Sequence, residues 1–81
     1  MKLIPVVSSM VSTVGYDVET GRLIVQFPGG GNASFWEYLD VPHQVVLTVL
    51  FAPSFGVEFN RLIKKGGFMN KRITVEQAIL A

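Results

Sequence analysis

The chain has 81 residues, which is the size of one small domain. Hydrophobic residues make up 49% of it and charged residues only 16%, so we expect a surplus apolar surface that a protein partner or self-association covers. The absence of cysteine excludes disulfides and thiolate metal sites, and a net charge of +1 does not by itself indicate a nucleic-acid binder.

Three strands are expected in the first half of the chain. They are rich in β-branched and aromatic residues and are separated by turn residues, Asp17 to Gly21 and the glycine-rich segment 28–32. The second strand alternates, with Leu23, Val25 and Phe27 on one face. This pattern predicts a three-stranded antiparallel meander over residues 11–16, 22–27 and 33–39.

Two helices are expected after the strands. Pro42 suits the first turn of a helix, and Asp40 is placed to favour the positive start of its dipole. Pro53 stops this helix, and Ser54 is a candidate N-cap for a second one that ends at Gly66-Gly67. The segment 68–73 is expected as a short fourth strand or an irregular stretch. Residues 74–80 start with capping-box spacing, which predicts a last helical turn or two.

These elements predict an α+β fold in which two helices pack on one face of the meander. We expect a single domain over residues 1–81, with its core at about 7–73, an N-terminal arm at 1–7 and a C-terminal tail at 74–81. The longest apolar run, Val45 to Ala52, is far shorter than the roughly 20 residues that span a bilayer. We therefore expect a cytoplasmic protein with no membrane contact.

Few residues indicate catalysis. His43 is the only histidine and lies at a helix start, and the carboxylates show no spacing typical of a metal site or an acid/base pair. The glycines at 29–31 lead into a strand and not into a helix, so they predict a hairpin loop and not a phosphate cradle. We expect a non-enzymatic binding protein with no cofactor and no metal.

Trp36 and Tyr38 are the most informative residues. They are two positions apart in an expected strand, so they share one face, while Glu37 lies on the other. The two rings could fill a core, or they could form a platform for nucleic-acid bases or a partner's side chains. Because a helix-covered core would reject an unpaired Glu37, we expect the rings to face the helices.

If these two rings fill the core, a partner must bind to other surfaces. Five basic residues and no acidic one occur between Arg61 and Arg72, which is either a solvated surface or a patch for phosphates or acidic partners. The arm from Leu3 to Val7 could add a strand to a partner's sheet or pair with the meander's own edge. Phe55 could be exposed or could staple the second helix. The predicted partner- or RNA-binding residues are Phe55, Arg61, Lys64, Lys65, Phe68, Lys71 and Arg72.

The order of these signals resembles the KTSC domain, a family named for its occurrence at the C-terminus of some lysyl-tRNA synthetases and also found as small stand-alone proteins of bacteria and phages. The resemblance covers roughly residues 7–73. It is carried by Ser8-Ser9, Gly15-Tyr16-Asp17, Leu23-x-Val25-x-Phe27, Trp36-x-Tyr38-x-x-Val41-Pro42 and Ala52-x-Ser54-x-Gly56-x-x-Phe59-Asn60-x-x-Ile63.

The resemblance implies an association with RNA, which is the usual suggestion for the family and rests partly on a Tyr-x-Tyr pair. Trp36 occupies the first position of that pair and Tyr38 the second. Phe55 stands where the family pattern has a Lys or another polar residue, and Glu58 replaces an aromatic one. These departures favour protein contacts over RNA contacts.

We therefore expect a module that docks on RNA-handling machinery, most plausibly a small phage or bacterial regulator that contacts RNA polymerase or a tRNA synthetase complex. The alternative is direct RNA binding through the basic segment. A homo-oligomer is compatible with either.

Overall fold

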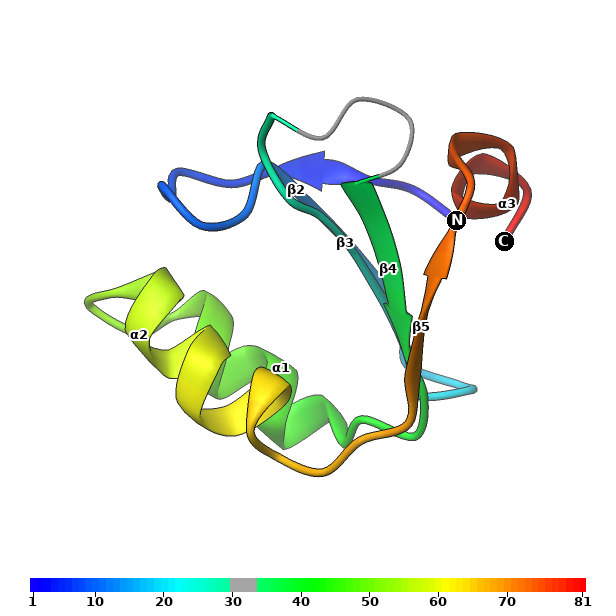
Figure 1. The fold of residues 1–81 in the computed structure, drawn as a ribbon. Coiled ribbons are helices and arrows are strands. Elements are labelled where there is room, and N and C mark those ends of the chain that lie inside the picture. The colour runs from blue at the N-terminus through cyan, green and yellow to red at the C-terminus, as the bar shows by residue number, and fades with distance from the viewer. Residues whose placement is uncertain (30–33) are drawn as a thin grey trace.

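A computed structural model describes residues 1–29 and 34–81. Its centre is an antiparallel sheet of five strands in the order β1-β2-β3-β4-β5, so each strand pairs with its neighbours in the chain. Helices lie on both sides of this sheet (Figure 1). In chain order the elements are β1 (Ile4–Pro5), β2 (Thr13–Asp17), β3 (Arg22–Gln26), β4 (Phe35–Tyr38), α1 (His43–Leu50), α2 (Phe55–Phe59), the π-helix η2 (Asn60–Lys64), β5 (Asn70–Ile73) and α3 (Val75–Leu80).

The α+β class and the antiparallel sheet are confirmed, but the count of three strands is wrong. The N-terminal arm supplies β1, which pairs with β2 through Ile4 opposite Val14 and continues with a bond from the Val6 N–H to the Ser12 oxygen at 3.0 Å. The arm therefore pairs with its own sheet, which was one of the two expectations for it. At the opposite edge β5 pairs with β4 along its whole length. The expected loop at 28–32 lies partly outside the described residues.

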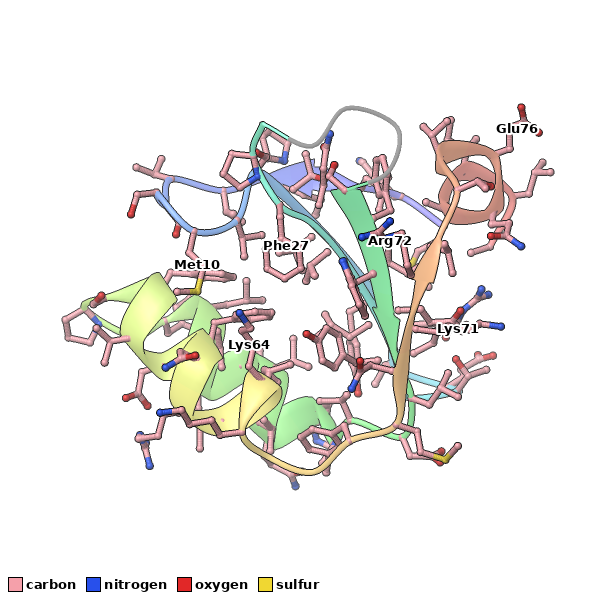
Figure 2. All side chains as sticks on the ribbon, in the orientation of Figure 1. Met10, Phe27, Lys64, Lys71, Arg72 and Glu76 are labelled. Carbon is pink, nitrogen blue, oxygen red and sulfur yellow. The ribbon has the colours of Figure 1, made fainter. Side chains whose placement is uncertain are left out.

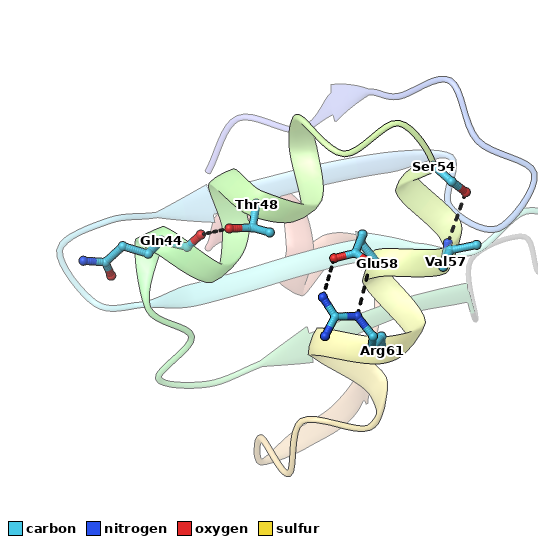
Figure 3. Close-up of polar contacts among 6 residues, drawn as sticks. All are labelled: Gln44, Thr48, Ser54, Val57, Glu58 and Arg61. Atoms are coloured by element: carbon cyan, nitrogen blue, oxygen red, sulfur yellow. Dashed lines mark hydrogen bonds and ion pairs between the residues drawn. The ribbon is translucent and has the colours of Figure 1, made fainter.

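The α1-α2-η2 layer covers one face of the sheet and forms the larger core (Figure 1). Ser54 caps α2 as expected, because its side chain accepts a bond from the Val57 N–H (Figure 3). That Asp40 favours the start of α1 stays a prediction. The first turn of α1 has no acidic residue, and Asp40 lies before it in a left-handed turn with φ 55°. The buried residues of this core are Val11, Val14, Leu23, Val25, Tyr38, Val41, Val46, Val49, Phe59 and Ile63.

A second, smaller core on the other face was not expected. Helix α3 starts with the predicted capping box of Thr74 and Gln77 and buries Ala78 against the sheet residues Ile24, Phe35 and Ile73. Met1 and Leu3 of the arm pack against the same cluster. Helices therefore cover both faces, and the tail at 74–80 is part of the fold.

An ion pair on the same face of the sheet explains how Glu37 is accommodated. Glu37 is only 6% exposed, and its carboxylate accepts a bond from the Arg22 Nε at 2.7 Å. Because Glu37 lies directly opposite Ile24, Arg22 is its diagonal neighbour on the same face. A buried charge is tolerated when it has such a partner. Glu37 faces away from the α1-α2-η2 layer, as expected, but it does not face open solvent.

None of the helices in the described ranges has the length and apolar character that a membrane crossing requires.

Candidate functional site

An open groove of about 440 Å³ lies beside the sheet and η2. Its lining comes from four segments that are distant in the sequence: the end of β3, β4, the end of η2 and the start of β5. The side chains that line it are Phe27, Trp36, Tyr38, Lys64 and Asn70. Three of these five side chains are aromatic, and we call these rings the aromatic floor of the groove, while Lys64 and Asn70 supply polar groups.

Two cations lie over the aromatic floor. The Lys64 Nζ is 5.6 Å from the centre of the Phe27 ring, and the Arg72 guanidinium is 5.9 Å from the Trp36 ring. Both distances are within the range of cation–π attraction, which contributes about 0.5 to 1 kcal/mol at exposed sites. Figure 2 shows that Lys64 and Phe27 approach each other from opposite sides of the gap between the helices and the sheet.

The backbone explains why these two cations lie over rings of the groove, Lys64 as one of its lining residues and Arg72 from beside it. Arg72 lies directly opposite Trp36 in the β4–β5 pair, so both side chains are on the same face of the sheet. Lys64 is the last residue of η2, a π-helix in which the Lys65 N–H bonds to the Asn60 oxygen five residues earlier, at 3.1 Å. Such helices are rare and occur frequently at functional sites.

Trp36 and Tyr38 face the helices as expected, but only Tyr38 fills the core, whereas Trp36 stays partly exposed. Tyr38 is only 4% exposed and packs edge-on against Phe59, with ring centres 6.0 Å apart. Its burial raises the pKa of its phenol. Trp36 is only half-buried and packs on the edge of the same core. The pair therefore contributes one core ring and one ring that the groove exposes.

Two of the predicted binding residues are separated from the groove. Arg61 lies on the outer surface of the helices, where it pairs with Glu58 at 2.7 Å (Figure 3). That contact raises the pKa of Arg61 and lowers the pKa of Glu58. Lys71 is next to Arg72 in β5 but on the other face of the sheet, where it lines a different hollow with Arg22.

The other predicted residues do not form a single patch either. Phe55 is half-buried and stacks on Phe59 with ring centres 5.9 Å apart, which matches the structural role foreseen for it. Phe68 is also half-buried and packs against the larger core. Lys65 is exposed just after η2. Of the seven predicted residues, Lys64 and Arg72 each have a charged group over an aromatic ring of the groove, and only Lys64 is among its lining residues.

Sequence reasoning missed two residues of the groove. The alternation of the expected strand places Phe27 on the same face as Leu23 and Val25. Phe27 also lies at the end of that strand, where the core stops, and this position could have indicated a ring at the edge of the core. Asn70 could not be assigned a face, because the register that sets it opposite Tyr38 depends on β5 being a strand. The alternation of β3 was therefore a usable signal for Phe27, whereas Asn70 had none.

The structure places the only histidine and tests for metal-binding clusters. His43 is exposed at the first position of α1. Within residues 1–29 and 34–81, no group of three or more His, Cys, Asp or Glu side chains is close enough to hold a metal ion. The arrangement of the groove is suited to stacking on flat ligands and to attracting negative charge.

Comparisons with known proteins agree on one family. The KTSC domain family model matches residues 7–68. An uncharacterized protein of Stutzerimonas stutzeri (strain A1501) is 36% identical over 73 residues, which is 90% of this chain and 99% of that protein. The crystal structure of a KTSC domain protein from Yersinia pestis has a TM-score of 0.78 and 32% identity, covering 89% of this chain and 96% of that one. The chain belongs to the KTSC domain family.

Proposed function

We propose that this domain binds single-stranded RNA in the groove beside η2. The observation that carries the proposal is that two aromatic rings of one groove, Phe27 and Trp36, each have a cation over them, Lys64 from the lining itself and Arg72 from beside it. Proteins that bind single strands commonly combine stacking rings with cations that follow the backbone. The geometry thus favours the alternative from the sequence over protein docking.

The low net charge is compatible with this function because the charge is locally uneven. The two ion pairs given above lie elsewhere: Glu58 is paired with Arg61 on the outer helix surface, and Glu37 is paired with Arg22 on the opposite face of the sheet. A local positive field at the groove is enough to attract phosphates.

The groove supports a modest affinity. Stacking one base on an aromatic ring contributes about 1 to 3 kcal/mol. If Lys64 and Arg72 each neutralise one phosphate, the logarithm of the affinity falls with the logarithm of the salt concentration with a slope of about −1.4, from about −0.7 per phosphate on a single strand. We therefore expect weak, salt-sensitive binding that is measurable at low ionic strength.

Neighbouring residues of β5 provide a matched test. Arg72→Ala removes a cation over the groove, whereas Lys71→Ala removes one from the opposite face of the same strand. Fluorescence anisotropy with short single-stranded RNA should show at least a fivefold loss for Arg72→Ala or Lys64→Ala, a salt slope smaller by about 0.7 for each, and a much smaller loss for Lys71→Ala. Single-stranded DNA of the same sequence tests whether the ribose is recognised.

Equal losses for Arg72→Ala and Lys71→Ala would show that only overall charge matters and that the groove is not the site. Wild-type protein with no salt-sensitive binding at low ionic strength would refute direct RNA binding altogether.

A second candidate function is docking on RNA-handling machinery by protein contacts, and a different surface favours it. Phe51 is 83% exposed at the end of α1, and Val57 is 63% exposed on α2. Both line a hollow of about 550 Å³ between these helices. Burying such apolar side chains is a typical contribution to a protein interface.

Recovery of tagged protein from cells distinguishes the two candidates. Under the docking proposal, RNA polymerase or tRNA synthetase subunits are retained by wild type and by Lys64→Ala but lost with Phe51→Ser. If none of these subunits is retained by the wild-type protein, the docking proposal fails.

A further inference from the structure

Strand β5 ends the sheet order, so within residues 1–29 and 34–81 no other strand covers its outer edge (Figure 1). Its first three residues, Asn70, Lys71 and Arg72, are all exposed. The strand at the opposite end, β1, has only two residues and includes a proline. A short edge with a proline is poorly suited to pairing with another chain, whereas β5 lacks proline.

The bonding pattern identifies the free groups of β5. The Leu39 N–H bonds to the Met69 oxygen at 2.9 Å, and these two residues lie opposite each other when the register of the β4–β5 pair is extended by one residue. Opposite residues in antiparallel strands alternate between bonded and non-bonded pairs. Lys71 and Ile73 therefore bond to β4, while the N–H and C=O groups of Asn70 and Arg72 point outward.

The charges at this edge select the partner. A second copy pairing through β5 would bring the Lys71 and Arg72 side chains of two molecules together, and like charges on adjacent strands are unfavourable. An incoming strand with acidic residues at two successive positions would set one carboxylate beside Arg72 on the groove face and the other beside Lys71 on the opposite face. Charge complementarity therefore favours an acidic extended segment.

We propose that the outer edge of β5 is a docking site for an extended acidic peptide, which adds to the sheet as a sixth strand. The backbone groups of Asn70 and Arg72 bind the peptide backbone, and Lys71 and Arg72 select its charge. This site shares the Arg72 side chain with the proposed RNA groove, but it differs in using the outward backbone groups of Asn70 and Arg72, which RNA binding does not require.

Amide hydrogen exchange followed by NMR tests the edge directly, with a blocked peptide containing Val-Glu-Glu-Val as the probe. In free protein the amides of Lys71 and Ile73 should exchange slowly and those of Asn70 and Arg72 quickly. Saturating peptide should slow exchange at Asn70 and Arg72 by at least tenfold. The same peptide with Lys in place of Glu should not.

A substitution at one residue separates backbone bonding from charge. Arg72→Pro removes the outward N–H together with the charge, and proline is tolerated at such an edge position because the N–H of residue 72 does not bond to β4. Arg72→Ala removes the charged side chain, including its contact with Trp36, but keeps the outward N–H. Arg72→Pro should weaken peptide binding several-fold more than Arg72→Ala, with both variants keeping the wild-type circular dichroism spectrum.

A double charge reversal, Lys71→Glu with Arg72→Glu, keeps the proposal testable if the proline variant does not fold. This variant should prefer the Lys peptide to the Glu peptide. The proposal is overturned if the peptide leaves exchange at Asn70 and Arg72 unchanged, if both peptides bind equally, or if these amides become protected with rising protein concentration in the absence of peptide, which would indicate a second copy at the edge.

Discussion

Phe59 should be the most sensitive position in the larger core. Its side chain is 1% exposed and contacts three other rings, Phe27, Tyr38 and Phe55, with ring centres 5.9 to 6.0 Å apart. Two of these three rings, Phe27 and Tyr38, also line the groove. A change at Phe59 therefore tests both the packing of the core and the support of the proposed site.

The conservative change Phe59→Leu keeps an apolar side chain but removes the ring. Each ring pair contributes about 0.5 to 1.5 kcal/mol beyond its buried area, so three pairs give about 1.5 to 4.5 kcal/mol. Partial repacking around Leu lowers this range, and we expect a loss of about 2 kcal/mol in the free energy of unfolding. For 81 residues the total is about 4 to 12 kcal/mol, so the variant should still fold.

Urea unfolding followed by circular dichroism measures this loss. With a dependence on urea of about 1 to 3 kcal/mol per M, the midpoint should fall by about 1 M. The matched control is Phe51→Leu, the same change at a side chain that is 83% exposed, which should cost less than about 0.5 kcal/mol. If the two variants unfold at the same urea concentration, Phe59 is not the centre of the core that the structure describes.

Further substitutions test local features of the fold by the same unfolding measurement. Gly21→Ala should lower the free energy of unfolding more than Gly29→Ala does. Both glycines have a positive φ (75° and 81°), but at Gly21 the new Cβ would also lie 3.2 Å from the Asp40 Cα, whereas at Gly29 it would meet no described atom within 4 Å. Equal losses for the two variants would contradict this. Gly15→Ala should cost about 1 to 3 kcal/mol by displacing the arm, since its Cβ would lie 2.9 Å from the Lys2 oxygen. Thr74→Ala should cost about 1 kcal/mol by removing the cap of α3, and Thr74→Ser should restore most of it.

Much of the fold follows from short-range patterns in the sequence. The alternation of β3 and the proline and serine signals around α1 and α2 indicated the meander and its helix layer. Strand β5 was ambiguous because its first three residues, Asn70 to Arg72, are polar and exposed, so no alternation marks them. It is a strand because β4 offers a partner edge, which is a tertiary cause that local propensity does not contain.

The second core was missed for a related physical reason. Glu37 seemed to mark a solvent face, since an unpaired carboxylate would not be buried. Its partner Arg22 is distant in the sequence and becomes a neighbour only through the register of β3 and β4. Tertiary structure also decides the groove. The sequence predicts Lys64 and Arg72 as binding residues, but it does not indicate that Lys64 lies over Phe27 and Arg72 over Trp36.

The contrast between Trp36 and Tyr38 connects the fold to the proposed function. Both rings are on the same strand and the same face, yet Phe59 covers Tyr38 while the strand neighbour of Trp36 is the exposed Arg72. An aromatic ring that only filled a core would be covered by apolar side chains. Cations over Trp36 and Phe27 instead keep these rings close to water while leaving them able to stack. This arrangement concentrates positive charge beside one groove, which is how a chain with a net charge of only +1 would bind the single strand of RNA that we propose.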